Sequence, residues 1–261
     1  MTSSAQRAGA GSEQLPTIVL IPGWNEAADK IDVFVSGRRG LAGLADAGFK
    51  CATFDGGKGA FSDRIDQLSR FITRLRDADP RVSTIALFGY SAGGLTARGL
   101  LRAYPDSPIS AIFQLAAPNA GMVTDDPRLR FHFEKSVIED MDVESPFMAW
   151  LNNTTGHWEH DGAHKRHWKL DAMPWTAPAG VPILNLVGRV PCYGNESDGV
   201  VSVESATLYG FVPHAFLEDP NANHLNLSGA WNPLTLVLRG WRSNDQLWPK
   251  AVAASAALFQ D

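Results

Sequence analysis

The chain has 261 residues, 44% of them hydrophobic and 20% charged, and a formal net charge of −5. This balance is typical of a globular protein with a sizeable core. No run rich in Lys and Arg is present, which argues against nucleic acid as a partner. No stretch approaches 18 consecutive apolar residues, so no membrane span is expected.

The first residues are small and polar and lack the apolar core of a signal peptide, so we expect a flexible tail over 1–14 and a cytoplasmic protein. The rest of the chain, 15–261, is expected to form a single domain. The two cysteines, Cys51 and Cys192, lie far apart in sequence and form no metal-binding pair. We expect them to be free thiols, as in a reducing compartment.

The first half of the chain alternates segments of strand and helix character. Short runs rich in β-branched residues predict strands at 17–23, 50–57, 81–89 and 109–118. Helices are predicted between them at 41–48, 61–80 and 94–104. Nearly continuous apolar strands that alternate with helices indicate a mostly parallel central sheet flanked by helices on both faces, in the α/β class.

The alternation breaks from about 119 to 178. This stretch is rich in Trp, His, Asp and Pro and contains no long apolar strand. Strand character resumes at 181–188 and 215–218, and a closing helix is expected at 253–259. We therefore expect one sheet domain with an inserted cap over about 119–178.

A short motif, GYSAG at 89–93, lies where a predicted strand meets a predicted helix. A strand that turns into a helix within a few residues needs a sharp bend, and glycines on both sides of Ser91 allow close approach there. The serine hydroxyl then stands at a helix N-terminus, where backbone N–H groups favour developing negative charge. This G-x-S-x-G pattern in this context predicts a nucleophile elbow at Ser91.

A serine nucleophile needs a base, usually a histidine that a carboxylate orients. In this topology the order along the chain is Ser, then Asp or Glu, then His, each after a strand. Asp198 lies in a Ser-Asp-Gly turn after the strand at 181–188, and His224 follows the strand at 215–218. The alternatives to these two are Glu196, Glu204 and Asp219 for the acid, and His214 for the base.

Four motifs in the right order resemble the α/β-hydrolase superfamily, within its lipase and esterase branch. IPGWNE at 21–26 is similar to the oxyanion loop, FGYSAGG at 88–94 to the elbow, ESDGVVSVESA at 196–206 to the acid loop, and NHLNL at 223–227 to the His-Leu motif. DMDVESPFMAWLN at 140–152 also resembles a segment of lipase insertions. The resemblance implies an α/β-hydrolase fold and ester hydrolysis through an acyl-enzyme, with a small-molecule ester as substrate and no cofactor.

Two departures from the family pattern are visible. Pro22 stands where many members have a histidine, and AAPNAG at 116–121 stands where lipases often have Thr-Pro-His-x-Gly, which argues against a typical triacylglycerol lipase. The oxyanion donors are expected to be backbone N–H groups of Ala92 and Trp24, with Asn25 as the alternative to Trp24. Pro22 has no N–H to offer.

Large apolar side chains gather in the expected cap. Candidate residues for the substrate pocket are Tyr90, Phe147, Met148 and Trp150. The cap residues among them could equally form the core of the cap itself. The choice stays open at this point.

The same insertion contains four histidines, His157, His160, His164 and His167, which a helix would align on one face. Glycines at 156 and 162 interrupt such a helix, and no HExxH pattern is present, so we expect no metal site. Three other functions remain open: an amidase or thioesterase with the same residues, a ligand-binding protein without catalysis, and a metal-dependent enzyme that uses these histidines.

Overall fold

The computed structural model describes residues 16–23, 50–56, 59–123, 135–160, 166–175, 177–178, 180–190, 196–218 and 224. The predicted tail over 1–14 and the predicted helices at 41–48 and 253–259 lie outside these residues. Among the residues described, no helix is long and apolar enough to cross a membrane.

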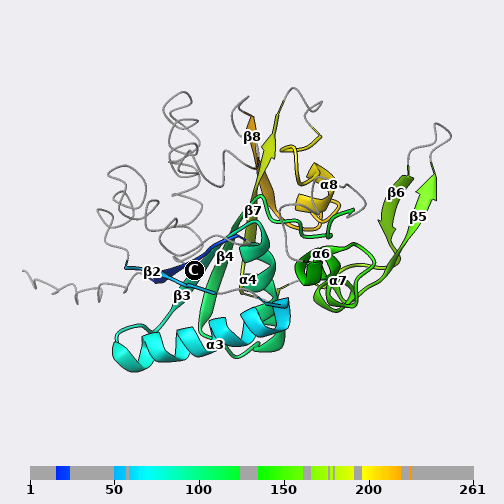
Figure 1. Ribbon diagram of the computed structural model, residues 1–261. Helices are drawn as coiled ribbons and strands as arrows, with labels where there is room; N and C mark the ends of the chain where they lie inside the picture. The colour runs from blue at the N-terminus through cyan, green and yellow to red at the C-terminus, as the bar shows by residue number, and fades with distance from the viewer. Residues whose placement is uncertain are drawn as a thin grey trace, which may run out of the picture.

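A parallel sheet forms the centre of the molecule (Figure 1). Its strands run in the order β2-β1-β3-β4-β7-β8, and every neighbouring pair is parallel. Their bounds are Thr17–Ile21 for β1, Cys51–Thr53 for β2, Ile85–Tyr90 for β3, Ile109–Leu115 for β4, Ile183–Arg189 for β7 and His214–Glu218 for β8. The predicted parallel sheet is confirmed. Because β1 lies between β2 and β3, the strand order reverses beside β3, the usual place for a site in such sheets.

Two long helices, α3 (Phe61–Ala78) and α4 (Ala92–Ala103), pack together along the sheet (Figure 1). Helix α3 presents one apolar stripe, because its buried residues recur with helical spacing at Phe61, Arg64, Ile65, Leu68 and Ile72. Helix α4 is buried on almost every side. It is enclosed because β1, β3 and β4 of the sheet, α3 and α7 (Pro146–Asn152) all pack against it.

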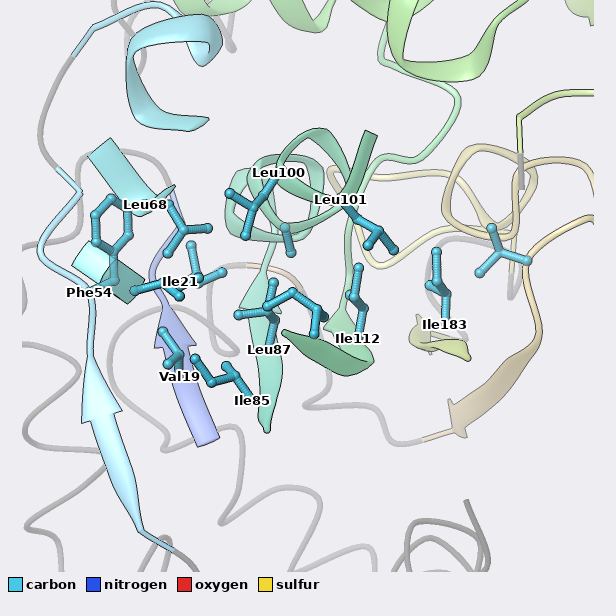
Figure 2. Packing of buried hydrophobic residues seen from close by; sticks show 14 of the residues in the cluster. Val19, Ile21, Phe54, Leu68, Ile85, Leu87, Leu100, Leu101, Ile112 and Ile183 are labelled. Atoms are coloured by element: carbon cyan, nitrogen blue, oxygen red, sulfur yellow. The ribbon is translucent and has the colours of Figure 1, made fainter. Parts of the chain in front are cut away.

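The main core lies between β1, β3, β4 and the helices. Figure 2 shows Leu87 and Ile112 of the sheet close to Leu100 and Leu101 of α4. All four side chains are at most 1% exposed. Their burial, at about 1.5–3 kcal/mol each, holds α4 against the face of the sheet.

The segment predicted as a cap contains α6 (Lys135–Met141), α7 (Pro146–Asn152) and an antiparallel hairpin of β5 (Gly156–His160) and β6 (Arg166–Leu170). Three of the four histidines discussed above thus lie on strands rather than on a helix, and His164 lies outside the described residues. The hairpin extends away from the sheet beyond α7 (Figure 1). Its cross-strand pair, Trp158 and Trp168, packs edge to face at 5.2 Å.

Helices α6 and α7 rest on the sheet domain through a second apolar cluster. Met148 and Leu151 of α7 are buried there together with Ala92 and Leu95 of α4. The carboxylate of Asp140 also accepts the Phe61 N–H at 3.1 Å, at the start of α3. These contacts join the inserted helices to the first turns of both long helices.

Candidate active site

Ser91 occupies a sharp turn between β3 and α4. Its backbone is left-handed, with φ 50° and ψ −122°, a conformation that a non-glycine residue adopts only under strain. Its N–H donates to the carbonyl oxygen of Leu115, at the end of the neighbouring strand, at 2.8 Å. The main chain thus holds the turn from the side of β4.

The two glycines of the motif are required by close backbone contacts. A Cβ on Gly93 would overlap the carbonyl oxygen of Ile21 and lie 2.6 Å from that of Pro22. A Cβ on Gly89 would lie 2.6 Å from the backbone of Gly93 and Gly94. Any larger residue at 89 or 93 would push the strand, the turn and the loop after β1 apart.

The Ser91 hydroxyl oxygen lies 3.0 Å from Nε2 of His224, although the two residues are 133 positions apart in sequence. Both side chains are largely buried, at 9% and 5% exposed. A hydroxyl and an imidazole nitrogen at this distance form a hydrogen bond, which is the geometry for transfer of the serine proton to the ring.

The second ring nitrogen of His224, Nδ1, lies 2.7 Å from Oδ2 of Asp198. Asp198 is 2% exposed, and its other oxygen, Oδ1, accepts from the N–H groups of Val200 at 2.9 Å and Val201 at 2.7 Å. The carboxylate is therefore oriented by the turn in which it lies. A carboxylate next to Nδ1 keeps the proton on that nitrogen and leaves Nε2 as the acceptor that faces Ser91.

The alternative residues lie elsewhere. Glu196 and Glu204 are exposed, and Asp219 lies outside the described residues. His214 is exposed at the start of β8, where its Nδ1 lies 3.0 Å from the Val212 carbonyl oxygen and its ring contacts Phe216. Of the candidates compared, the structure brings Ser91, Asp198 and His224 together.

One of the two predicted oxyanion donors can be located. Ala92 is the first residue of α4, and the N–H groups of a first helical turn have no partner within the helix. Trp24 and its alternative Asn25 lie outside the described residues. The loop that leads to them is held by Arg64, whose Nη2 donates to the Pro22 carbonyl oxygen at 3.1 Å.

Arg64 was not predicted from the sequence. It is 1% exposed, and burial lowers the pKa of its guanidinium to about 10. The sequence nevertheless indicates that Arg64 is buried, because it falls on the apolar stripe of α3, three residues after Phe61. A charged residue at a stripe position commonly has a specific partner.

The four predicted pocket residues lie in different surroundings. Phe147 stacks on Phe61 at 4.6 Å, and Met148 is 1% exposed in the cluster that contains Ala92. Trp150 is 39% exposed and covers the guanidinium of Arg102, near the far end of α4. The hydroxyl of Tyr90 donates to the main-chain carbonyl oxygen of His224 at 2.7 Å.

A buried network of polar side chains lies behind the site, around Arg98 of α4. It was not predicted from the sequence. Arg98 of α4 donates to Oδ1 of Asn119 at 3.1 Å and to Oδ1 of Asn152 in α7 at 2.9 Å. Asn119 in turn bonds the side chain of Gln114 in β4, which donates to the Gly94 carbonyl oxygen at 3.0 Å. The network thus links α7, β4 and the first turn of α4.

Arg98 is buried in this network with neutral oxygen acceptors. Burial, and to a lesser extent the nearby charge of Arg102, lower the pKa of its guanidinium to about 9. Asn119 also donates to the carbonyl oxygen of Ala206, at the end of the short helix α8 (Val203–Ala206) that follows the Asp198 turn. The same amide therefore fixes the acid loop relative to α4.

One histidine of the hairpin, His157, is paired with two carboxylates on the exposed surface. Nδ1 of His157 lies 2.7 Å from Asp171, and Nε2 lies 3.4 Å from Glu159. The hydrogen bonds to Asp171 and then to Glu159 raise the pKa of His157 above 6.5. Within the part of the chain that the structure describes, no group of three or more His, Cys, Asp or Glu residues is arranged to hold a metal ion.

No family model matches the sequence, and a comparison with curated proteins finds no significant match. Solved structures of lipases and esterases are nevertheless similar to it. The mature lipase BlEst2 from Bacillus licheniformis has a TM-score of 0.61 at 13% identity, over 88% of this chain and 94% of that one. A metagenomic carboxyl esterase has a TM-score of 0.54 at 15% identity, over 90% and 77%.

Lipase B from Aspergillus fumigatus has a TM-score of 0.55 at 14% identity. The match covers 90% of this chain but only 54% of lipase B, so the chain spans about half the length of that protein. At identities this low, the TM-scores above 0.5 show a common fold and no more. The predicted α/β-hydrolase fold is therefore confirmed.

Proposed function

We propose that this chain, which has the α/β-hydrolase fold of known lipases and esterases, is a serine hydrolase that cleaves carboxylic esters. The observation that carries the proposal is one continuous line of hydrogen bonds. It runs from Oγ of Ser91 to His224 at 3.0 Å and from His224 to Asp198 at 2.7 Å. A nucleophile, a base and an orienting carboxylate within hydrogen-bond reach are what covalent catalysis by serine requires.

In the proposed reaction, Oγ of Ser91 attacks the ester carbonyl carbon and its proton passes to Nε2 of His224. The C–O bond to the alcohol then breaks, and His224 returns the proton to the departing oxygen. A water molecule next attacks the acyl-enzyme, with His224 again as the base. The carboxylic acid is released and the Ser91 hydroxyl is restored.

Asp198 supports both steps without taking up a proton. Its Oδ2 stabilises the imidazolium that forms on His224 and keeps the ring in the correct tautomer. The two N–H donors on Oδ1 hold the carboxylate in place during these steps. The burial of all three side chains strengthens each of these interactions.

The negative oxygen of the tetrahedral intermediate needs backbone donors. Ala92 at the start of α4 and Trp24 after β1 are the proposed pair. The bond from Arg64 to Pro22 and the contact of Gly93 with the Ile21 carbonyl support this assignment, since both fix the loop that leads to Trp24. Loss of one such donor typically costs about 10²–10³ in kcat.

The acyl group is proposed to bind beside the inserted helices. Phe147 and Met148 lie in or against the apolar cluster that contains Ala92, the neighbour of Ser91. An apolar wall at this place favours a hydrocarbon chain over a charged acyl group. Tyr90 is assigned a different role below, and Trp150 contributes to the outer surface of α7.

The test combines active-site labelling with turnover. Wild type, Ser91→Ala and the control Ser62→Ala, an exposed serine on α3, are treated with a fluorescent fluorophosphonate. The same proteins are assayed on p-nitrophenyl esters of increasing acyl length, and on matched amides and thioesters. Wild type and Ser62→Ala should label and turn over esters, and Ser91→Ala should do neither.

The outcomes separate the alternatives. Turnover of amides or thioesters in preference to esters would keep the residue roles and change the substrate class. A folded wild type that neither labels nor hydrolyses any substrate would overturn the proposal. The profile of kcat/KM against acyl length then measures how much chain the apolar wall accepts.

A further inference from the structure

Tyr90 links the strand that carries Ser91 to the main chain of His224. It is the last residue of β3 and the immediate neighbour of Ser91, and its ring is 6% exposed. Its hydroxyl donates to the main-chain carbonyl oxygen of His224, 134 positions away, at 2.7 Å. The two rings lie tilted against each other with centroids 5.5 Å apart. The residue before the nucleophile thus contacts the base residue through both its ring and its hydroxyl.

The main chain of His224 is held at both of its polar groups. Its N–H donates to the main-chain carbonyl oxygen of Asp198 at 2.8 Å, and its C=O accepts from Tyr90. The side chain is held at both ring nitrogens, by Asp198 and by Ser91. Asp198 therefore holds the N–H of His224. Tyr90 holds its C=O and ties it to β3, the strand that leads to the nucleophile.

This arrangement fixes the distance between two residues that are carried by different strands of the sheet. Ser91 is fixed by β3 and α4, whereas His224 follows β8, which is separated from β3 by β4 and β7. Small relative movements would lengthen the 3.0 Å contact between Oγ and Nε2. Because Tyr90 and Ser91 are adjacent in the chain, a bond from Tyr90 to the His224 main chain sets the base directly against the nucleophile.

We infer that Tyr90 is a positioning residue for His224 in the proposed ester hydrolysis, and that its hydroxyl rather than its ring is the essential part. The inference rests on the proposed function. Tyr90 takes up no proton and touches no reacting atom in this role. It also differs from the role of pocket wall that the sequence suggested, because its hydroxyl is engaged with the main chain of His224.

The test removes the hydroxyl and keeps the ring, with Tyr90→Phe. The matched control is Tyr104→Phe, since the Tyr104 hydroxyl donates to Asp66 at 2.7 Å on the surface at the far end of α4. A third variant carries 4-aminophenylalanine at position 90, which restores a donor at the same point of the ring. Competent sites are counted by fluorophosphonate labelling to completion, so that kcat refers to folded enzyme only.

A misplacement of about 1 Å costs on the order of 100-fold in rate, so Tyr90→Phe should lower kcat by about 10- to 100-fold. KM for a short p-nitrophenyl ester should change less than about twofold, because no substrate contact is lost. The downfield proton resonance of the His224–Asp198 hydrogen bond should broaden or shift. The 4-aminophenylalanine variant should recover most of kcat, and Tyr104→Phe should match wild type.

Each other result decides against the inference. A raised KM with unchanged kcat would make Tyr90 a pocket wall, and unchanged kcat and KM would make its hydroxyl dispensable. A lower melting temperature with normal kcat per titrated site would leave it a purely structural role. If Tyr90→Phe does not fold, a kcat near that of wild type in the 4-aminophenylalanine variant supports the inference. A kcat of that variant lowered by about 10-fold or more overturns it. A wild type without labelling or turnover would instead overturn the proposed function, and this inference with it.

Discussion

Asp198 has two carboxylate oxygens with separate tasks. Oδ1 is occupied by the N–H groups of Val200 and Val201, and this leaves Oδ2 to face Nδ1 of His224. The turn therefore selects which oxygen meets the histidine. Asparagine has the same shape, so the same two donors would hold it in the same place. The substitution therefore changes only the charge and the group that faces Nδ1.

In Asp198→Asn, the carbonyl oxygen of the amide should face the two N–H groups, and its NH₂ should then face Nδ1. The ring would be forced into the tautomer that carries its proton on Nε2, which cannot take the proton of Ser91. We expect kcat to fall by about 10⁴-fold with a small change in KM. Steady-state kinetics on a p-nitrophenyl ester measure this, with Glu196→Gln as the nearby control. Retention of more than a tenth of wild-type kcat would contradict it.

Gly93 permits the close approach of α4 to the loop after β1. In Gly93→Ala the new methyl group would collide with main-chain carbonyl oxygens, which cannot move aside as a flexible side chain can. We expect a loss of about 3 kcal/mol or more in the free energy of unfolding. Urea titration followed by circular dichroism measures it.

The control for this substitution is Gly180→Ala. Gly180 has φ 92° and nothing within 4 Å of a new Cβ, so the variant reports the cost of the backbone conformation alone, about 1–2 kcal/mol. A loss of less than about 1 kcal/mol in Gly93→Ala would mean that movement of the loop relieves the contact, because alanine is otherwise favoured over glycine within a helix.

At the scale of elements, α4 joins the site to the inserted segment. Its first turn follows Ser91, its middle carries Arg98, and its outer side is covered by α7. Asn152 at the end of α7 accepts from Arg98 at 2.9 Å and donates to the Asn119 carbonyl oxygen at 3.1 Å. The inserted helices are thus joined to α4 by buried hydrogen bonds as well as by apolar packing.

Asn152→Ala should remove an acceptor from a buried guanidinium. Hydrogen bonds to charged groups contribute about 1.5–3 kcal/mol, so a loss of this size in unfolding free energy is expected from urea titration. The control is Asn153→Gly, which removes a bond to the more exposed Arg102 and suits the left-handed conformation of Asn153, φ 54°. Its effect should stay within about 0.5 kcal/mol. A silent Asn152→Ala would mean that water replaces the amide.

At the scale of the whole molecule, the site lies at the carboxyl ends of the strands of the sheet. Ser91 follows β3, Asp198 follows β7 and His224 follows β8. The strands are all parallel, so their carboxyl ends lie on the same side, and side chains distant in sequence meet there. The distance of 3.0 Å between Ser91 and His224 is therefore a property of the complete sheet and not of any segment.

Cys51 in β2 offers a report on the integrity of this sheet. Burial raises the pKa of its thiol to about 11, so at pH 8 its thiolate fraction is about a hundredfold below that of a thiol of pKa 9.0. In a Cys192→Ser background, we expect iodoacetamide to alkylate Cys51 slowly in the native protein and rapidly in urea, as followed by mass spectrometry. Equal rates in both states would show that β2 opens readily in the native protein.

Much of the fold could be predicted because its signals are local. The apolar runs at 17–23 and 109–118 correspond to β1 and β4, and the periodic stretch at 61–80 corresponds to α3. The parallel arrangement follows from the alternation of strands and helices, since a parallel strand needs a crossover. The motif around Ser91 carried its own structural reason, namely glycines where main chains touch. The roles of Ser91, Asp198 and His224 themselves stay predictions until they are tested.

By itself, the sequence determined the strands, the parallel sheet, the turn at Ser91 and the order of the candidate residues, because each depends on neighbouring residues or on periodicity. Only the tertiary structure decided that Arg98 lies among amides and that Tyr90 holds the main chain of His224. These contacts join residues tens to more than a hundred positions apart. Their partners are chosen by how the layers pack, and no local pattern records that choice.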